Sequence, residues 1–77
     1  MKISIHSLEK TLYEGSGKVV SLPSSEGEIS ILDHHIPLIT ILKKGKIKIK
    51  DEKESHDFPI ESGFAEVSGE KVTILIK

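Results

Sequence analysis

The 77-residue sequence predicts one all-β domain over residues 1–77, an antiparallel β-sandwich of about nine or ten short strands. Apolar and polar residues alternate with period two along most of the chain, as they do in half-buried strands. Isoleucine and valine dominate the apolar residues whereas alanine occurs only at Ala65, and β-branched side chains pack well on a pleated sheet. Turn residues recur at about the 8–12-residue spacing of sandwiches and barrels.

The first half of the chain contains four predicted strands separated by turns. Their apolar positions are, in order, Ile3 and Ile5, Leu12 and Tyr13, Val20 and Leu22, and Ile29 and Ile31. Residues 14–17 and 23–25 are rich in Gly, Ser and Pro, which favour turns, and they end the second and third strands. In the fourth strand, Glu28 and Ser30 alternate with the isoleucines and are expected to face water.

The second half begins with an uncharged run, residues 38–42, which predicts a central strand buried on both faces. The next strand alternates Ile47 and Ile49 with lysines, so one face is expected in the core. Pro59 predicts that the following strand lies at an edge, because proline cannot donate a ladder hydrogen bond. The remaining predicted segments are a turn at 43–45, a charged hairpin tip at 51–55, a strand at 64–67, and a last strand carrying Val72, Ile74 and Ile76.

Composition argues against several classes of function. The basic residues are all lysine and the formal net charge is −1, so the chain lacks both the arginine forks and the positive field typical of nucleic-acid-binding proteins. The alternating residues 1–6 do not resemble a secretory signal. The run at 36–42 is far shorter than the ~20 residues of a membrane span. We therefore expect a soluble, cytosolic protein without direct membrane insertion and without a nucleic-acid partner.

Two acidic residues, Glu26 and Glu28, are the first candidate for a catalytic site. On one face of a strand they would form a carboxylate pair suited to acid–base chemistry. A catalytic pair also needs a substrate cleft, usually lined with aromatic residues, and the chain has only one Tyr, two Phe and no Trp. A solvated turn is the favoured interpretation.

The adjacent histidines His34 and His35 are the second candidate, with Asp33 as a possible third metal ligand. Neighbouring residues on a strand point to opposite faces, so both imidazoles would reach one ion only from an irregular loop. His6 and His56 are distant in sequence. The favoured interpretation is again a polar loop, and we predict no metal site.

Two lysine-containing segments complete the candidates. Residues 15–18, GSGK, lack the glycine spacing and the following Ser or Thr of a phosphate-binding loop, and they are interpreted as a hairpin turn. The stripe of Lys46, Lys48 and Lys50 is interpreted as a solvated face that prevents the strand from pairing with another chain, with an acidic partner as the alternative. The sequence therefore predicts neither catalysis nor cofactor binding.

Four segments in order nevertheless resemble a known family. They are KTLYEG at 10–15, VVSLPSSEGEISIL at 19–32, HIPLIT at 35–40 and ESGFAEVSGEKVTIL at 61–75. Together they are similar to the N-terminal β-sandwich of the epsilon subunit of F-type ATP synthase, over essentially the whole chain.

The resemblance implies a non-catalytic subunit of the central rotor stalk of a proton-translocating ATP synthase. Such a subunit binds the gamma subunit and the c-subunit ring, meets the catalytic alpha/beta head indirectly, and helps couple proton flow to ATP synthesis. The expected location is peripheral, on the cytoplasmic side of the bacterial plasma membrane. The ring contact maps to Ser24, Ser25, Glu26, Gly27 and Glu28, and contacts to gamma include the positions of Ser7 and His35.

The chain departs from the family pattern at three places. Asp33-His34-His35 replaces the family's Pro-Gly-His, so the turn is expected to differ. Ser62-Gly63-Phe64 replaces Gly-Gly-Phe, which leaves Gly63 as the residue expected to take a positive backbone angle. The C-terminal helical hairpin typical of the family does not follow Lys77 in this sequence. A free-standing β-sandwich protein-binding module remains the alternative function.

Overall fold

The computed structural model describes residues 1–34 and 37–77, and these residues form nine β-strands and no helix. The strands are β1 (Lys2–His6), β2 (Thr11–Ser16), β3 (Val19–Ser24), β4 (Gly27–Leu32), β5 (Leu38–Leu42), β6 (Gly45–Lys50), β7 (Ser55–Ile60), β8 (Gly63–Ser68) and β9 (Lys71–Ile76). The all-β class and the strand number predicted from alternation are confirmed. With strands alone, the described residues include no helix that could cross a bilayer.

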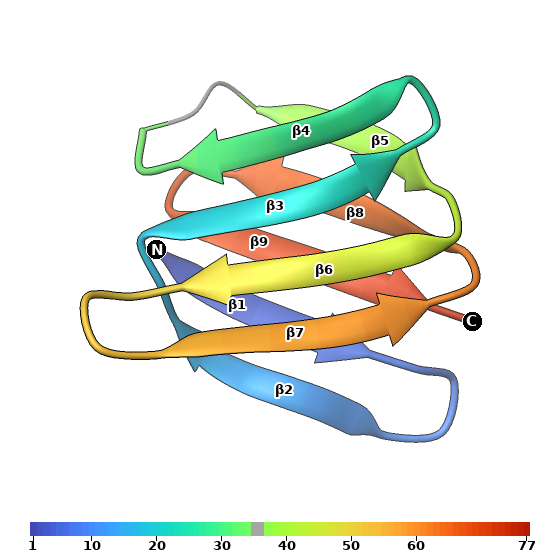
Figure 1. Cartoon of the computed structure of the whole chain (residues 1–77), viewed down its shortest axis with the longest axis horizontal. Helices are drawn as coiled ribbons and strands as arrows, with labels where there is room; N and C mark the ends of the chain where they lie inside the picture. The colour runs from blue at the N-terminus through green and yellow to red at the C-terminus, as the bar shows by residue number, and fades with distance from the viewer. Residues whose placement is uncertain (35–36) are drawn as a thin grey trace.

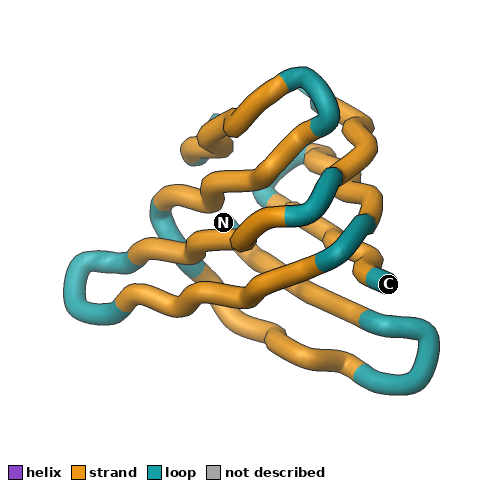
Figure 2. The backbone as a smooth tube through the Cα atoms, turned by 45° about the vertical axis from the view of Figure 1, so that its right-hand side comes forward, coloured by secondary structure: helices purple, strands orange, loops and turns teal. Residues whose placement is uncertain are grey.

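The strands are arranged in two layers that belong to one continuous, curled sheet (Figures 1 and 2). The hydrogen-bonded order is β2-β1-β9-β8-β5-β3-β6-β7, and β4 pairs with the other edge of β3. In Figure 1, β4, β3, β6 and β7 form the front layer, and β5, β8, β9 and β1 lie behind them. The layers are joined at β3 and β5, where a single pair, Ser24 with Leu42, is in register. Because so little pairing crosses this point, the sheet folds over there.

One strand pair departs from the antiparallel pattern. β1 runs parallel to β9, with Ile3 opposite Val72 and Ile5 opposite Ile74. All other strand pairs in the described residues are antiparallel. The parallel pair brings the first and last strands side by side, and it follows from the number of reversals between them rather than from any local sequence signal.

The core is aliphatic and lies between the two layers. Its buried members are Ile3, Ile5, Val20, Leu22, Ile31, Leu42, Ile47, Ile49, Ile60, Ala65, Val67, Val72 and Ile74. They come from every strand except β2, and they occupy alternate positions where a strand contributes two, as period two requires. Each fully buried aliphatic side chain contributes about 1.5–3 kcal/mol relative to exposure, so this shared interior is what holds the layers together.

The predicted burial of residues 38–42 on both faces is wrong. Leu42 is buried, but the side chains of Ile39 and Ile41 are 62% and 64% exposed. The sandwich has only two layers, so a strand has only one core face, and no third layer covers the outer face of β5.

Two local predictions at glycines are also corrected. Gly15 and Ser16 belong to β2, so only residues 17–18 form the turn that was expected at 15–18. Gly63 does not have a positive φ; the positive-φ glycines are Gly27 and Gly69. Gly63 is instead required by close packing, because a Cβ there would lie 2.6 Å from the carbonyl oxygen of Leu75 on β9.

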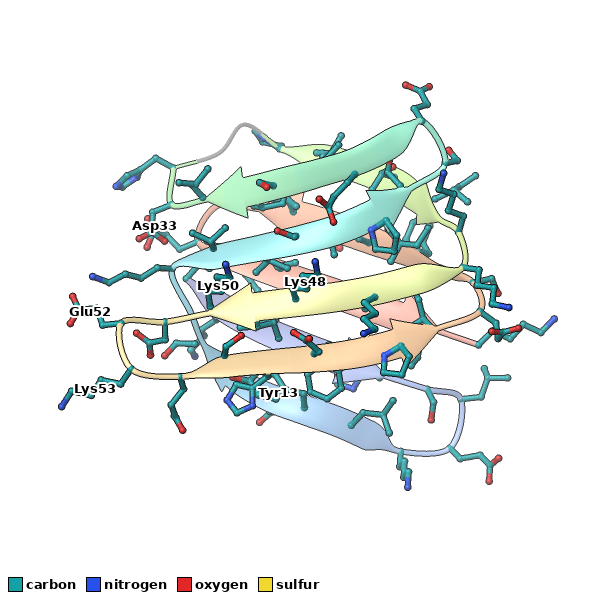
Figure 3. All side chains as sticks on the ribbon, in the orientation of Figure 1. Tyr13, Asp33, Lys48, Lys50, Glu52 and Lys53 are labelled. Atoms are coloured by element: carbon teal, nitrogen blue, oxygen red, sulfur yellow. The ribbon has the colours of Figure 1, made fainter. Side chains whose placement is uncertain are left out.

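β2 and β7, the first and last strands of the hydrogen-bonded order, contact each other through their side chains. Tyr13, labelled on β2 in Figure 3, contacts two rings of β7. Its ring centroid lies 5.4 Å from that of Phe58, in an edge-on arrangement, and 5.3 Å from that of His56. Pro59 lies within β7, which pairs with β6 alone, so the predicted edge strand is confirmed. Aromatic contacts, rather than backbone pairing, close this side of the sandwich.

The turns divide between the two ends of the strands (Figure 1). One end carries the connections at 7–10, 25–26, 43–44 and 61–62 together with the C-terminus, and we call it the β3–β4 end. The opposite end carries the connections at 17–18, 51–54 and 69–70, residues 33–34 after β4, and the N-terminus.

Candidate functional site

The outer face of the back layer carries a group of exposed apolar side chains. Ile41, Phe64 and Leu75 lie opposite one another on β5, β8 and β9, and they form a continuous cross-strand row. Their side chains are all exposed, and Ile39 lies two residues from Ile41 on the same face. We call these four residues the apolar corner. Contiguous exposed apolar groups of this kind mark sites of protein–protein contact.

A surface loop extends this group at the β3–β4 end. The side chain of Leu8 is 96% exposed. The loop is held by Ser7, whose Oγ accepts hydrogen bonds from the N–H groups of Glu9 and Lys10 and donates one to the Lys10 carbonyl. Ser7, an expected gamma contact, therefore shapes the loop that presents Leu8.

A shallow hollow connects this loop with the apolar corner. It has a volume of about 300 Å³ and its lining is mostly apolar. Leu8, Ile41, Phe64, Leu75 and Ile76 contribute side chains to it. The hollow can receive an apolar side chain of a partner protein, and its polar lining offers no arrangement suited to covalent chemistry.

The segment expected to contact the c ring forms the turn between β3 and β4. Ser25 and Glu26 are turn residues, Glu28 is the second residue of β4, and all three are exposed. Ser24 is buried, and its Oγ accepts a hydrogen bond from the N–H of Glu26 at 3.1 Å. Gly27, with φ of 127°, completes the reversal. Ser24 supports the turn, and the other side chains of the segment face outward.

The turn and the apolar corner occupy neighbouring parts of the molecule. The Ser25 N–H donates to the Ile41 carbonyl at 2.9 Å, and the Lys43 N–H donates to the Pro23 carbonyl at 2.8 Å. These two hydrogen bonds tie the β3–β4 turn to the end of β5. A partner that covers Ile41 therefore lies beside the turn.

The carboxylates Glu26 and Glu28 do not share a strand face, because Glu26 lies in the turn. Both are exposed to solvent, and neither makes an ion pair with another described residue. The solvated interpretation of this pair is the one that the geometry supports.

The histidine segment lies at the opposite end. Asp33 accepts a hydrogen bond from the amino group of Met1 at 3.0 Å, and the Nδ1 atom of His34 lies 3.3 Å from Oε1 of Glu70. His35, the second expected gamma contact, lies outside the described residues. Among residues 1–34 and 37–77, no three His, Cys, Asp or Glu side chains converge as metal ligands would.

The outer face of the front layer is polar. The lysines at 46, 48 and 50 alternate with the buried Ile47 and Ile49, as the sequence predicted, and Lys48 lies opposite Asp57 on β7. Lys48 and Lys50 are labelled along β6 in Figure 3. The two outer faces of the sandwich thus differ in character, with the apolar corner on the back layer and the lysine stripe on the front.

The apolar corner and Leu8 were missed in the sequence. The signal was present in residues 38–42, an uncharged strand in a chain too short to build a third layer. In a two-layer sandwich, a strand that is apolar on both faces must expose one of them. Such a strand predicts one exposed apolar face rather than burial on both faces.

Comparisons with known proteins agree on one family. The family described as ATP synthase, Delta/Epsilon chain, beta-sandwich domain matches residues 1–77. Curated relatives include the chloroplastic ATP synthase epsilon chain of Gracilaria tenuistipitata var. liui, 37% identical over 99% of this chain and 57% of the relative. The ATP synthase epsilon chain of Caulobacter vibrioides is 36% identical over 97% of this chain and 87% of the relative.

Solved structures share the fold. A chain in the cryo-EM structure of the central stalk and c ring of Tetrahymena thermophila mitochondrial ATP synthase matches with a TM-score of 0.83 and 18% identity, over 99% of this chain and 62% of that chain. A chain of Euglena gracilis mitochondrial ATP synthase matches with a TM-score of 0.88 and 19% identity, over 96% of this chain and 48% of that chain.

The share of each relative that is matched varies. The chain spans a little more than half the length of the Gracilaria relative, at 57%, but most of the Caulobacter relative, at 87%. In each case the matched part includes nearly all of this chain, and the family match includes all of it. The chain therefore belongs to the ATP synthase delta/epsilon chain family, whose β-sandwich domain matches residues 1–77.

Proposed function

We propose that this chain acts as the non-catalytic epsilon subunit in the rotor stalk of a proton-translocating F-type ATP synthase. In this role it binds the gamma subunit and the c ring, meets the alpha/beta head only indirectly, and helps couple proton flow to ATP synthesis. As part of this complex, the chain lies peripherally on the cytoplasmic side of the bacterial plasma membrane. Family membership supports the assignment of the chain to an ATP synthase complex. The exposed apolar surface of the sandwich supports a role in binding partner subunits.

The apolar corner is the observation that carries the proposal. Its four large apolar side chains are exposed in the isolated chain, whereas the core of a protein interface is depleted in charge and rich in such residues. We assign this surface, together with the Ser7–Leu8 loop, to the gamma subunit. His35 remains a proposed gamma contact from the family resemblance alone.

The β3–β4 turn supports the proposed contact with the c ring. Ser25, Glu26 and Glu28 are exposed at one tip of the molecule, and the turn that carries them is braced by the buried Ser24. A tip of this shape can meet the polar loops of a membrane ring without inserting into the bilayer. Its position beside Ile41 allows gamma and the ring to be bound together.

Binding to an epsilon-free complex of the alpha, beta and gamma subunits tests the gamma contact. We expect the wild-type chain to bind this complex and Ile41→Lys to bind it at least about tenfold more weakly, because a lysine in the desolvated centre of the interface would be buried without a partner. Leu32→Lys is the matched control, since Leu32 is 55% exposed but lies on the front layer.

The binding experiment has three outcomes that distinguish the proposal from its alternatives. Loss of binding in Ile41→Lys but not in Leu32→Lys, with both variants melting like wild type, supports the assignment. Absence of binding by the wild-type chain would refute it and favour a free-standing β-sandwich that serves another protein. Equal weakening by both variants would show that the apolar corner is not the contact.

A further inference from the structure

Two further rows of side chains lie on the same outer face as the apolar corner. The middle row begins next to Ile39 and runs through Glu66, Thr73, Ser4 and Glu14, each opposite the next across the strands. The outermost row runs through Ser68, Lys71, Lys2 and Ser16. We call these the acidic row and the lysine row. From the β3–β4 end to the opposite end, the face therefore changes from apolar to acidic to basic.

The charged side chains in these rows make no ion pair with another described residue. The described residues make three ion pairs, which join Met1 to Asp33, Lys18 to Glu52 and His34 to Glu70. None involves Glu66, Glu14, Lys71 or Lys2. All four side chains are exposed. They are therefore open to charges on a partner.

The lysine row also borders a hollow in the surface. Its volume is about 510 Å³, and its lining includes Lys2, Lys71, Ser4, Ser16 and Glu14. Lys2 and Lys71 lie opposite each other on the parallel strands β1 and β9. Like charges directly opposite are unfavourable in the isolated sheet. A carboxylate placed between them would relieve this repulsion.

We propose that the polar rows set the orientation and the rate of docking on the gamma subunit, an inference that rests on the proposed function. The gamma surface then carries three matching bands: an apolar stripe over the apolar corner, basic side chains opposite Glu66 and Glu14, and a carboxylate in the hollow between Lys2 and Lys71. The apolar corner supplies most of the affinity. The two charged rows exclude the reversed orientation.

A second copy of this chain cannot complement all three rows of this face. In a face-to-face dimer, the twofold axis lies in the interface, along or across the strands. An axis along the strands, or an axis across them through the acidic row, places the acidic row against its own copy, so Glu66 would meet carboxylates. An axis across the strands through the apolar corner leaves both charged rows outside the contact. Like-charge contacts of this kind suppress a wrong partner. Charge complementarity therefore points to a different protein with the opposite pattern.

Charge reversal on this face, measured by association kinetics with the epsilon-free complex, tests the proposal. At about 20 mM salt, where screening is weak, we expect Glu66→Lys and Lys71→Glu each to associate about tenfold more slowly than wild type. At about 0.5 M salt the deficit should fall below about twofold, because the screening length is then only a few ångströms. Lys46→Glu, on the polar outer face of β6, is the matched control and should associate like wild type.

The outcomes separate this inference from the proposed function. If Ile41→Lys weakens binding but both charge variants associate at the wild-type rate, the apolar docking stands and the orienting role of the polar rows is wrong. If the wild-type chain itself does not bind the complex, the proposed function fails first. Concentration-dependent dimerisation of the wild-type chain that Ile41→Lys abolishes would overturn the choice of partner.

Discussion

His34 adopts a backbone conformation that is unusual for its residue type. Its φ is 67°, in the left-handed region, and it stands where the similar family has the glycine of Pro-Gly-His. A side chain in this region costs about 1–2 kcal/mol relative to the right-handed alternative. The loop thus keeps a left-handed residue although the glycine is absent. The contact between His34 and Glu70 offsets little of the cost, because both side chains are exposed.

Replacing His34 by glycine should therefore stabilise the chain. Relief of the strained φ outweighs the extra freedom of glycine in the unfolded state, and we expect a gain of about 0.5–1 kcal/mol in the free energy of unfolding. For a domain of this size, that raises the melting temperature by a few degrees. Thermal unfolding followed by circular dichroism measures the change.

His34→Ala separates backbone strain from loss of the imidazole. Alanine removes the same side-chain atoms but keeps a Cβ in the left-handed region, so the melting temperature should not rise. An increase in His34→Ala equal to that in His34→Gly would show that the imidazole, not the backbone, destabilises the loop.

β4 illustrates how one strand divides its residues between structure and docking. Ile31 faces the core and is 1% exposed, whereas Glu28, three residues earlier, faces water at the start of the strand. Among the described strands, β4 pairs only with β3. Alternation in the sequence was sufficient to predict both side-chain directions, because the two faces of a strand have different environments here.

Glu28→Lys and Ile31→Lys should consequently act on different properties. Ile31→Lys buries an unpaired charge and should unfold the domain or cost several kcal/mol. Glu28→Lys should leave the free energy of unfolding within about 0.5 kcal/mol of wild type. Because Glu28 lies in the proposed ring contact, its reversal should weaken assembly on the membrane sector, increase the salt sensitivity of assembly, and reduce proton-driven ATP synthesis.

Denaturant unfolding of the two variants and reconstitution of Glu28→Lys with epsilon-depleted membranes provide the measurements. If Glu28→Lys melts as badly as Ile31→Lys, Glu28 is a structural residue. Normal melting with normal ATP synthesis would remove Glu28 from the proposed ring contact.

The stability of the whole sandwich depends on contact between β2 and β7, the two terminal strands of its sheet. β2 and β7 are the terminal strands of the hydrogen-bonded path, and the rings of Tyr13, His56 and Phe58 meet between them. Aromatic pairs contribute about 0.5–1.5 kcal/mol beyond the area that they bury. The total free energy of unfolding of such a domain is on the order of 5–10 kcal/mol, so these aromatic contacts account for a substantial share of it.

Tyr13→Ala should therefore lower the free energy of unfolding by about 2–3 kcal/mol, through lost burial and lost ring contacts. Tyr13→Phe keeps the ring and should stay within about 0.5 kcal/mol of wild type. Urea unfolding measures both, and hydrogen exchange in β2 should accelerate in Tyr13→Ala more than exchange in β8 does. Equal stability of Tyr13→Ala and wild type would show that other contacts close the sandwich.

Much of this architecture could be predicted from local patterns. The nine strands follow from alternation and the edge position of β7 from Pro59. The turn predicted at 23–25 lies instead at 25–26, because Pro23 and Ser24 continue β3. These features depend on interactions between residues close in the chain, such as side-chain direction and turn conformation. The same patterns indicated which side of β6 faces the core, since lysine and isoleucine alternate there without exception.

The candidate docking surface depended on contacts between residues far apart in the chain. Ile41, Phe64 and Leu75 form one row only because β5, β8 and β9 pair in a particular register. Likewise, Lys2 meets Lys71 only through the parallel pairing of the first and last strands. A period-two pattern specifies two faces of a strand but not which strand lies beside it or which face a second layer covers. Strand order, register and the number of layers are set by how the whole chain buries its aliphatic residues, and this arrangement leaves the outer face of an apolar strand exposed.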